Sequence, residues 1–287
     1  MTKRAVIVVV ALSLLAAGCG QEGTIIPDLT AERGTAAPDA TTAPQASPGA
    51  TNASGATASP APGQATAAPT TAPQAQTTKP AAEGGVNAPK DGSYVYTYSG
   101  ESDDPFNPAA PPQRFDGELT VDISHQGNVY TSEQTNTETP GRFTTRARWE
   151  TDRILLLSFK TETPGGDFSC TFDPPLVVAK IPIRPETFPT QNFKGTGNAC
   201  QGKLDITVEG QETVKDATGR SWSTWRARIR LQAGNEQFTN TTDQSQWLSP
   251  ELGVEVRTDG TSHGEIRTAG GSQTFDGKAA TALKRQP

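Results

Sequence analysis

Apolar and polar residues alternate one by one in several stretches of the second two-thirds of the chain. The apolar members of four such stretches are Leu119, Val121 and Ile123; Phe143, Ala147 and Trp149, with Thr145 on the same face; Leu204, Ile206 and Val208; and Trp225, Ala227, Ile229 and Leu231. Successive side chains of a β-strand point to opposite faces, so this period of two gives each strand one apolar and one polar face. The pattern predicts antiparallel strands that cover a core from one side.

Turn-forming pairs separate these stretches, and no helical spacing of useful length occurs between them. The pairs are Asp91-Gly92, Pro140-Gly141, Gly165-Gly166, Gly234-Asn235, Asp259-Gly260 and Gly270-Gly271. Short strands at this spacing are typical of barrels, half-barrels and sandwiches, and the spacing predicts about nine to eleven of them. We therefore expect an all-β fold: a single antiparallel half-barrel or barrel-like domain over residues 91–287.

One predicted strand departs from the alternation, because Ile154, Leu155, Leu156 and Leu157 are all apolar and Phe159 follows. Either a loop or another element covers the second face of this strand, or that face lines a hydrophobic cavity for an acyl chain or a similar ligand. Five further residues could extend such a lining: Leu176, Val177, Val178, Ile181 and Ile183. The prolines around them (Pro174, Pro175, Pro182 and Pro185) favour an edge strand or a lid over a central strand.

The first third of the chain has a different composition. All 18 aromatic residues lie at or beyond Tyr94, and residues 30–90 consist mainly of Ala, Thr, Pro, Ser, Gly and Gln. Such a segment cannot bury enough apolar surface to offset its ordering entropy. We expect a disordered tether over residues 19–90, of which the 60 or so residues from 30 to 90 would span about 40 Å as a flexible coil and about 190 Å fully extended. Its many Thr and Ser residues invite O-glycosylation.

The N-terminus has the features of an export signal. Lys3 and Arg4 precede an apolar run, residues 5–17, that is too short to span a bilayer and suits a signal peptide. The run ends in Leu15-Ala16-Ala17-Gly18-Cys19, which resembles the lipobox of bacterial lipoproteins, with Ala16 where that family prefers Leu. The resemblance implies removal of residues 1–18 and linkage of Cys19 to diacylglycerol, which would anchor the chain to the membrane on its extracytoplasmic side. The alternative is an ordinary secretory signal that leaves Cys19 unmodified.

Charge limits the partners that the domain can attract. The chain has 25 Lys and Arg against 31 Asp and Glu, a net charge of −6, and loss of Lys3 and Arg4 makes it −8. This balance argues against a nucleic-acid binder and gives no net attraction to anionic phospholipid. Contact with the membrane is therefore expected to depend on the lipid anchor, which needs two or more acyl chains to hold stably.

Two cysteines remain once Cys19 is assigned to lipidation. Cys170 and Cys200 form an even pair in an exported protein, which favours a disulfide. The alternative, a redox-active pair, lacks the Cys-x-x-Cys spacing.

A short segment of the domain resembles a known signature. Residues 247–256 read Trp-Leu-Ser-Pro-Glu-Leu-Gly-Val-Glu-Val, in which Pro250 and Gly253 suit a turn between paired strands. The segment is similar to one found in bacterial envelope lipoproteins with a curved antiparallel half-barrel sheet, and residues 210–214 and 225–227 resemble the strand pair that precedes it. The resemblance implies the same kind of sheet and assigns no catalytic residue.

Chemistry-bearing residues are sparse. The two histidines, His125 and His263, do not converge with enough other ligands for a zinc site and are expected to be ordinary surface side chains. An acidic stretch with Glu101, Asp103, Asp104 and Asn107 lacks the spacing of an EF-hand and is expected to be a solvated turn, with calcium binding as the alternative. The sequence therefore predicts no catalytic residue, metal site or cofactor, although carboxylates brought together from distant strands could still support a hydrolase.

Two rows of arginines form the remaining feature. Arg226, Arg228 and Arg230 share one strand face, and Arg142, Arg146 and Arg148 share another. If both strands lie in one sheet, the rows would form a basic stripe able to bind phosphate or carboxylate groups of an envelope polymer or lipid. The alternative is ion pairing on a solvated face with Glu133, Glu209, Glu212 or Glu236.

Together these features predict a lipid-anchored cell-envelope protein that is not an enzyme. The leading interpretation is a binding module for a lipid or another amphiphilic envelope component. The alternative is a protein–protein accessory or assembly factor at the cell surface.

Overall fold

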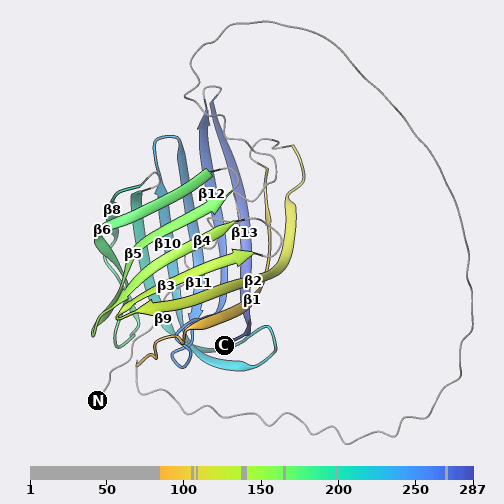
Figure 1. Cartoon of the computed structure of the whole chain (residues 1–287). Coiled ribbons are helices and arrows are strands. Elements are labelled where there is room, and N and C mark those ends of the chain that lie inside the picture. Colours follow the sequence, from red (N-terminus) through yellow and green to blue (C-terminus); the bar gives the residue numbers. More distant parts are fainter. Residues whose placement is uncertain are drawn as a thin grey trace, which may run out of the picture. The chain divides into compact units, whose positions relative to one another are not determined.

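The computed structural model describes residues 85–104, 107, 109–136, 141–163, 166–197, 200–268 and 271–287. Cys19 and the predicted signal peptide lie outside the described residues, as does most of the predicted tether. The described residues form thirteen strands (Figure 1). Their bounds are β1 Gly92–Ser102, β2 Gln113–Gln126, β3 Val129–Asn136, β4 Arg142–Trp149, β5 Arg153–Thr163, β6 Gly166–Lys180, β7 Glu186–Thr187, β8 Gln191–Lys194, β9 Gln201–Lys215, β10 Ser221–Gly234, β11 Phe238–Leu248, β12 Glu255–Thr268 and β13 Gly271–Arg285.

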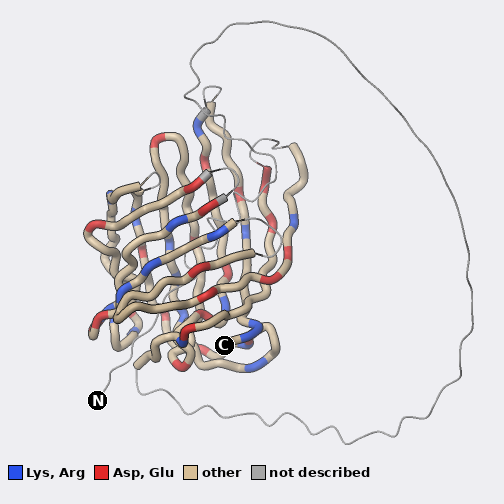
Figure 2. The backbone as a smooth tube through the Cα atoms, in the orientation of Figure 1, with Lys and Arg blue, Asp and Glu red and all other residues tan. Residues whose placement is uncertain are grey.

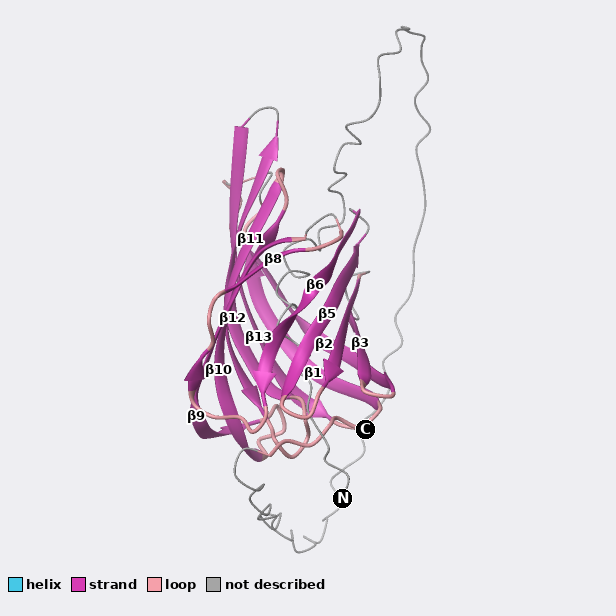
Figure 3. Cartoon of the chain, turned by 90° about the vertical axis from the view of Figure 1, so that its left-hand side faces the viewer, coloured by secondary structure: helices cyan, strands magenta, loops and turns pink. Residues whose placement is uncertain are grey.

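All thirteen strands belong to one antiparallel sheet. Its order is β6-β5-β4-β3-β2-β1-β13-β12-β11-β10-β9-β7, and β8 also pairs with β9. Every strand from β1 to β6 pairs with its neighbour in sequence, as does every strand from β9 to β13, and β1 pairs with β13 to join the two runs. The sheet curls so that two walls face each other across the interior (Figure 3). The prediction of a single all-β antiparallel half-barrel is confirmed.

The inner face of the curled sheet carries the core. The residues predicted to point inward from the alternating stretches are buried, apart from the half-buried Ala227. Tyr94 and Tyr96 of β1 and Leu283 of β13 are each 2% exposed or less and lie where the two runs of strands join. Period-two burial of this kind is what fixes the register of each strand, since a slip by one residue would expose the apolar face.

Two details of the strand prediction are wrong. The strands number more than nine to eleven because β7 and β8 are only two and four residues long and lie in a proline-rich segment that gave no clear alternation. Asp259-Gly260 is not a turn but lies inside β12, where Gly260 pairs with Gln244 and Ala279. Asp259 suits this strand because its carboxylate accepts from Arg257 on the same face, at 2.7 Å.

The apolar run in β5 is explained by a β-bulge. Ile154, Leu156 and Phe159 point inward and belong to the core, whereas Leu155 lies on the outer face beside Arg148 and Val177 in the register. Leu157 is the extra residue of the bulge and pairs with neither neighbouring strand. Because a bulge inserts one residue, it shifts the alternation and brings apolar residues together in the sequence.

The two ends of the sheet meet along a line that we call the seam, where β6 approaches residues 191–197 and Cys200. The disulfide between Cys170 and Cys200 crosses it, as predicted. Beside the disulfide, Thr171 and Thr196 exchange two backbone hydrogen bonds of 2.8 and 3.0 Å. Farther along β6, the side-chain amide of Gln191 accepts from the backbone N–H of Val177 and donates to its carbonyl, both at 2.7 Å. The seam thus satisfies part of a strand edge that would otherwise be free to pair with another chain.

Candidate functional site

A groove of about 500 Å³ lies on the outer face of the sheet, and we call it the outer groove. Five strands supply most of its lining. The lining residues are Glu101, Ser102 and Asp103 at the end of β1; Pro112; Arg230 of β10; Thr241 and Asp243 of β11; Thr261, Ser262 and His263 of β12; and Asp276, Gly277 and Lys278 of β13. Its volume falls in the range of small-molecule binding sites.

Strand register places the charged residues of the outer groove in a row. In the register, Arg230 is opposite Asp243, Asp243 is opposite Thr261, Thr261 is opposite Lys278, and Lys278 is opposite Glu101. Residues directly opposite each other on one face have Cβ atoms about 5 Å apart, so the row runs without interruption across β10, β11, β12, β13 and β1. The outer groove therefore presents alternating charges and hydroxyl groups over five neighbouring strands.

Four side chains of the groove already interact in pairs. Lys278 Nζ lies 2.7 Å from Glu101 Oε1, and His263 Nδ1 lies 2.7 Å from Asp276 Oδ1. The hydrogen bond and the charge of Lys278 lower the pKa of Glu101. Asp103 Oδ2 accepts from the backbone N–H of Asp276 at 3.3 Å, which ties the end of β1 to β13. These contacts fix one side of the groove.

Arg230 and Asp243 are placed differently. Both are exposed and directly opposite each other, yet among the described residues neither forms an ion pair or a side-chain hydrogen bond. The hydroxyl groups of Thr241 and Thr261 are likewise without a hydrogen-bond partner in this part of the chain. The groove therefore offers one cation, one anion and two hydroxyl groups that can reach a ligand.

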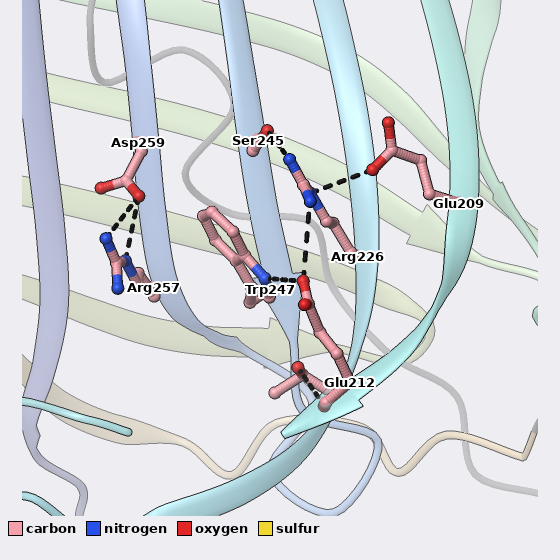
Figure 4. A network of polar contacts seen from close by, with 8 residues as sticks. Glu209, Glu212, Arg226, Ser245, Trp247, Arg257 and Asp259 are labelled. Carbon is pink, nitrogen blue, oxygen red and sulfur yellow. Dashed lines mark hydrogen bonds and ion pairs between the residues drawn. The ribbon is translucent and has the colours of Figure 1, made fainter. Parts of the chain in front are cut away.

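A second polar network lies on the same outer face around Trp247 of β11 (Figure 4). The Trp247 indole N–H donates to the carboxylate of Glu212 in β9. Arg226 Nε lies 3.0 Å from Glu209 and 3.9 Å from Glu212. The guanidinium carbons of Arg226 and Arg257 lie 5.4 and 5.3 Å from the centre of the Trp247 ring. Trp247 is 8% exposed, so this network packs an aromatic ring beneath paired charges and leaves little of it for a ligand.

The three arginines predicted to bind anions have different environments. Arg226 is held in the Trp247 network, as the ion-pairing alternative expected, and Arg230 lines the outer groove. Arg228 is exposed and outside the groove.

The basic stripe that two neighbouring arginine rows would have formed is absent from the described sheet. Both strands belong to the one sheet, but β3, β2, β1, β13, β12 and β11 separate β4 from β10. The strands β1 to β6 extend the sheet in one direction from the β1–β13 pair, and β13 to β9 extend it in the other. Arg142 lies 3.3 Å from Glu133, and Arg148 lies 3.2 Å from Glu150. Acidic and basic residues are interspersed over the strands (Figure 2).

The interior holds a much smaller cavity, of about 30 Å³, near the C-terminal end of β6. Residues of β6, the 181–188 segment and strands β9, β10 and β11 line it, and Val178 and Ile183 among them were expected to line a cavity. Ile154, Leu155, Leu156, Leu157 and Phe159 line neither this cavity nor the outer groove. A volume of 30 Å³ is about that of one water molecule in the liquid.

The remaining chemistry-bearing residues do not converge. His125 Nδ1 lies 2.6 Å from Asp91 Oδ1, and both side chains are about half exposed. No group of three or more His, Cys, Asp or Glu side chains among the described residues could hold a metal ion. Of the acidic stretch, Glu101 and Asp103 line the outer groove, and the backbone of Asp104 accepts from Asn107. None of the described residues forms a helix that could cross a membrane.

Similarity to known proteins is limited to structure. No protein-family model and no curated protein matches the chain. The chain is similar to a crystal structure from Bacteroides fragilis that is described as a "putative exported protein with YmcC-like fold", with 10% identity, a TM-score of 0.35, and coverage of 69% of this chain and 97% of that one.

Sequence reasoning missed the outer groove. Its residues come from strands that are far apart in the sequence, and β12 was divided by an expected turn at Asp259-Gly260, so the row through Thr261 could not be built. The outward positions of β10 to β13 do alternate charged and hydroxyl-bearing residues, which was the available signal.

Proposed function

We propose that this protein is a non-enzymatic binding module of the bacterial cell envelope, anchored to the extracytoplasmic face of the membrane by a lipid on Cys19. The signal-like N-terminus and the small residues before Cys19 support the anchor. The disulfide between Cys170 and Cys200 supports an oxidising compartment outside the cytoplasm. The long Ala/Thr/Pro-rich segment would then set how far the folded domain reaches from the bilayer.

The ligand that we propose is the polar head of an amphiphilic envelope component, bound in the outer groove. The observation that carries this proposal is the contrast between the two cavities: about 500 Å³ with a charged lining outside, and about 30 Å³ inside. Sites that enclose small molecules have volumes of about 300–1,000 Å³. Of these two cavities, only the outer groove is large enough for a head group, whereas the inner one is too small for an acyl chain.

The electrostatics of the groove suit binding better than acid catalysis. A general acid needs a carboxyl group whose pKa is raised towards neutrality. Hydrogen bonding to Lys278 instead lowers the pKa of Glu101 and keeps this carboxylate charged. Its paired charge can orient a bound group without exchanging a proton.

Native mass spectrometry of the protein purified from cell envelopes tests this proposal. We expect the wild-type protein to carry a stoichiometric amphiphile, identified in the organic extract after denaturation. The Thr261→Arg variant should lose it, because the long side chain would fill the centre of the groove. The control variant Thr144→Arg places the same side chain on the outer face of β4, outside the groove, and should retain the ligand.

Two outcomes would contradict the proposal. A bare protein mass for the wild type would show that no ligand is retained. A protein partner retained in its place would favour the accessory-factor alternative. Equal retention of the ligand by both variants would show that it binds outside the outer groove.

A further inference from the structure

We infer that the outer groove recognises a zwitterionic ligand, with an anionic group bound by Arg230 and an ammonium group bound by Asp243. This inference rests on the proposed binding function of the same groove and names the class of head group. It concerns the charges that remain once the internal pairs of the groove are set aside.

Arg230 lies between two aspartates and forms an ion pair with neither. By register it is opposite Asp205 in β9 and Asp243 in β11, both of which could form a cross-strand ion pair. Asp205 instead accepts from the hydroxyl group of Thr190 at 2.6 Å. Within the described part of the chain, no carboxylate lies within ion-pair distance of Arg230, and Asp243 has no cationic partner. An exposed Arg and Asp at neighbouring positions of a groove are thus both available.

The net charge of the groove argues against a simple ion. Its lining has two cationic side chains, Arg230 and Lys278, and four acidic ones, Glu101, Asp103, Asp243 and Asp276, which gives a net charge of −2 when His263 is neutral. An anion alone would be repelled by this excess of carboxylates. A cation alone would leave the Arg230 guanidinium without a partner. A ligand that carries both charges satisfies both sides.

The spacing fits a small zwitterion. Opposite residues in an antiparallel sheet have Cβ atoms about 5 Å apart, so ligand groups bound by Arg230 and Asp243 would be separated by only a few bonds. A planar guanidinium presents two parallel N–H donors that match a phosphate or carboxylate group. The hydroxyl groups of Thr241 and Thr261 flank Asp243 and can accept from an ammonium group or donate to an anionic oxygen. Both a free metabolite and a lipid head group can carry this pattern of charges.

Isothermal titration calorimetry with three probes tests the charge pattern: O-phosphoethanolamine, ethanolamine and inorganic phosphate. We expect wild-type protein to bind O-phosphoethanolamine at least about tenfold more tightly than either fragment. Loss of a charge-assisted hydrogen bond should weaken binding about tenfold or more. Arg230→Ala should therefore weaken O-phosphoethanolamine and phosphate but not ethanolamine, and Asp243→Asn should weaken O-phosphoethanolamine and ethanolamine but not phosphate.

Arg228→Ala is the matched control, because Arg228 lies on the same face of β10 and outside the groove. It should bind all three probes as the wild type does. Vesicles of phosphatidylethanolamine, compared with phosphatidylglycerol vesicles, distinguish a lipid source from a free one, since only a lipid ligand predicts retention on the former.

Two results would overturn the inference. One is O-phosphoethanolamine binding no more tightly than phosphate or ethanolamine alone. The other is an equal effect of Arg230→Ala and Arg228→Ala. The proposed function would survive either result if the purified wild-type protein still carried an amphiphile that Thr261→Arg removes, so the two failures are distinguishable.

Discussion

Gly253 has two separate reasons to be glycine. Its φ of +75° lies in the left-handed region, within the turn that links β11 to β12. The segment before β1 also crosses this turn closely, with the Asn87 N–H donating to the Pro250 carbonyl at 2.8 Å. A Cβ atom at position 253 would overlap the backbone oxygen of Asn87. Both the conformation and the close approach therefore exclude a side chain.

We expect Gly253→Ala to lower the free energy of unfolding by more than the conformational cost alone. The matched control is Gly219→Ala, because Gly219 has a φ of +87° and open space around its missing Cβ. A left-handed non-glycine residue costs about 1–2 kcal/mol, which is the loss expected for the control. Urea unfolding of both variants measures the difference, and equal losses would show that the segment at Asn87 yields without cost.

Asp216 closes the turn between β9 and β10. Its carboxylate accepts from Trp222 Nε1 at 2.8 Å, from the Thr218 hydroxyl at 2.7 Å and from the Arg220 backbone N–H at 3.0 Å. Burial alone would raise the pKa of this group, but these hydrogen bonds outweigh it and lower the pKa of Asp216 below the usual 3.8. The folded protein thus favours the ionised form.

The lowered pKa of Asp216 predicts a pH-dependent contribution to stability. The contribution is fully present above the unfolded-state pKa and is lost as the pH falls through the folded-state pKa. We expect Asp216→Asn to destabilise the protein at pH 6, with the difference from wild type shrinking towards about pH 2. Urea unfolding over this range measures it. Thr218→Ala, which removes one donor and keeps the carboxylate, should retain a weaker pH dependence, and a difference that does not change with pH would contradict the prediction.

At the scale of single residues, the sequence predicted the inner face better than the outer face. The inward positions of β2, β4, β9 and β10 could be assigned because burial forces a period of two on apolar residues. Outward polar residues have no such constraint, so nothing in the sequence distinguished Arg226, which is held by Glu209, from Arg230, which lines the groove.

Among the elements, β6 carries an edge that the rest of the fold must satisfy. It is the first strand in the sheet order and contains Pro174 and Pro175, which is consistent with the predicted edge. The seam covers this edge with a disulfide, one backbone bridge and one side-chain amide rather than with a continuous strand pair. Opposite β6, these contacts are made by Gln191 of β8, Thr196 and Cys200. Each is a separate link and not part of a continuous ladder of hydrogen bonds.

Removal of the disulfide should destabilise the fold without changing its topology. Cys170 and Cys200 are 30 residues apart, and closing a loop of this length is worth about 3.6 kcal/mol in the chain-entropy model. We expect the double variant Cys170→Ser/Cys200→Ser to lose about this amount of unfolding free energy, and the wild type to lose the same amount in a reductant. Urea unfolding measures both, and stability unaffected by the double substitution would contradict the prediction.

Gln191 is expected to protect the exposed edge of β6. Its amide makes two hydrogen bonds to the backbone of Val177, and two such bonds contribute about 1–3 kcal/mol together. We expect Gln191→Ala to speed hydrogen exchange at the Val177 amide and to increase self-association, because a free strand edge can pair with another copy. Asn192→Ala, at the exposed neighbouring position, is the control. Unchanged exchange at Val177 would show that the seam holds without this amide.

At the scale of the whole molecule, topology explains what the sequence could and could not predict. The half-barrel follows from hairpins between neighbouring strands, whose alternation and turns are local signals. The outer groove depends on the pairing of β1 with β13, the first and last long strands, which brings Glu101 beside Lys278. Pairing between two strands that are so far apart in the sequence leaves no local signal in it. The same pairing places the strands from β3 to β11 in the sheet order between the two arginine rows, which therefore form no single stripe.

Stable membrane attachment should depend on Cys19. The chain without residues 1–18 has a net charge of −8, so electrostatic attraction to anionic lipid cannot hold it, whereas two or more acyl chains can. We expect Cys19→Ser to abolish labelling by radioactive palmitate and to move the protein from the membrane fraction to the soluble extracytoplasmic fraction. The double variant Cys170→Ser/Cys200→Ser keeps Cys19 and should remain labelled and membrane-bound, which separates lipidation from the disulfide. Retention of an unlabelled Cys19→Ser variant that has lost its signal peptide would contradict this prediction, because binding by the folded domain would then be enough to hold the protein in washed membranes.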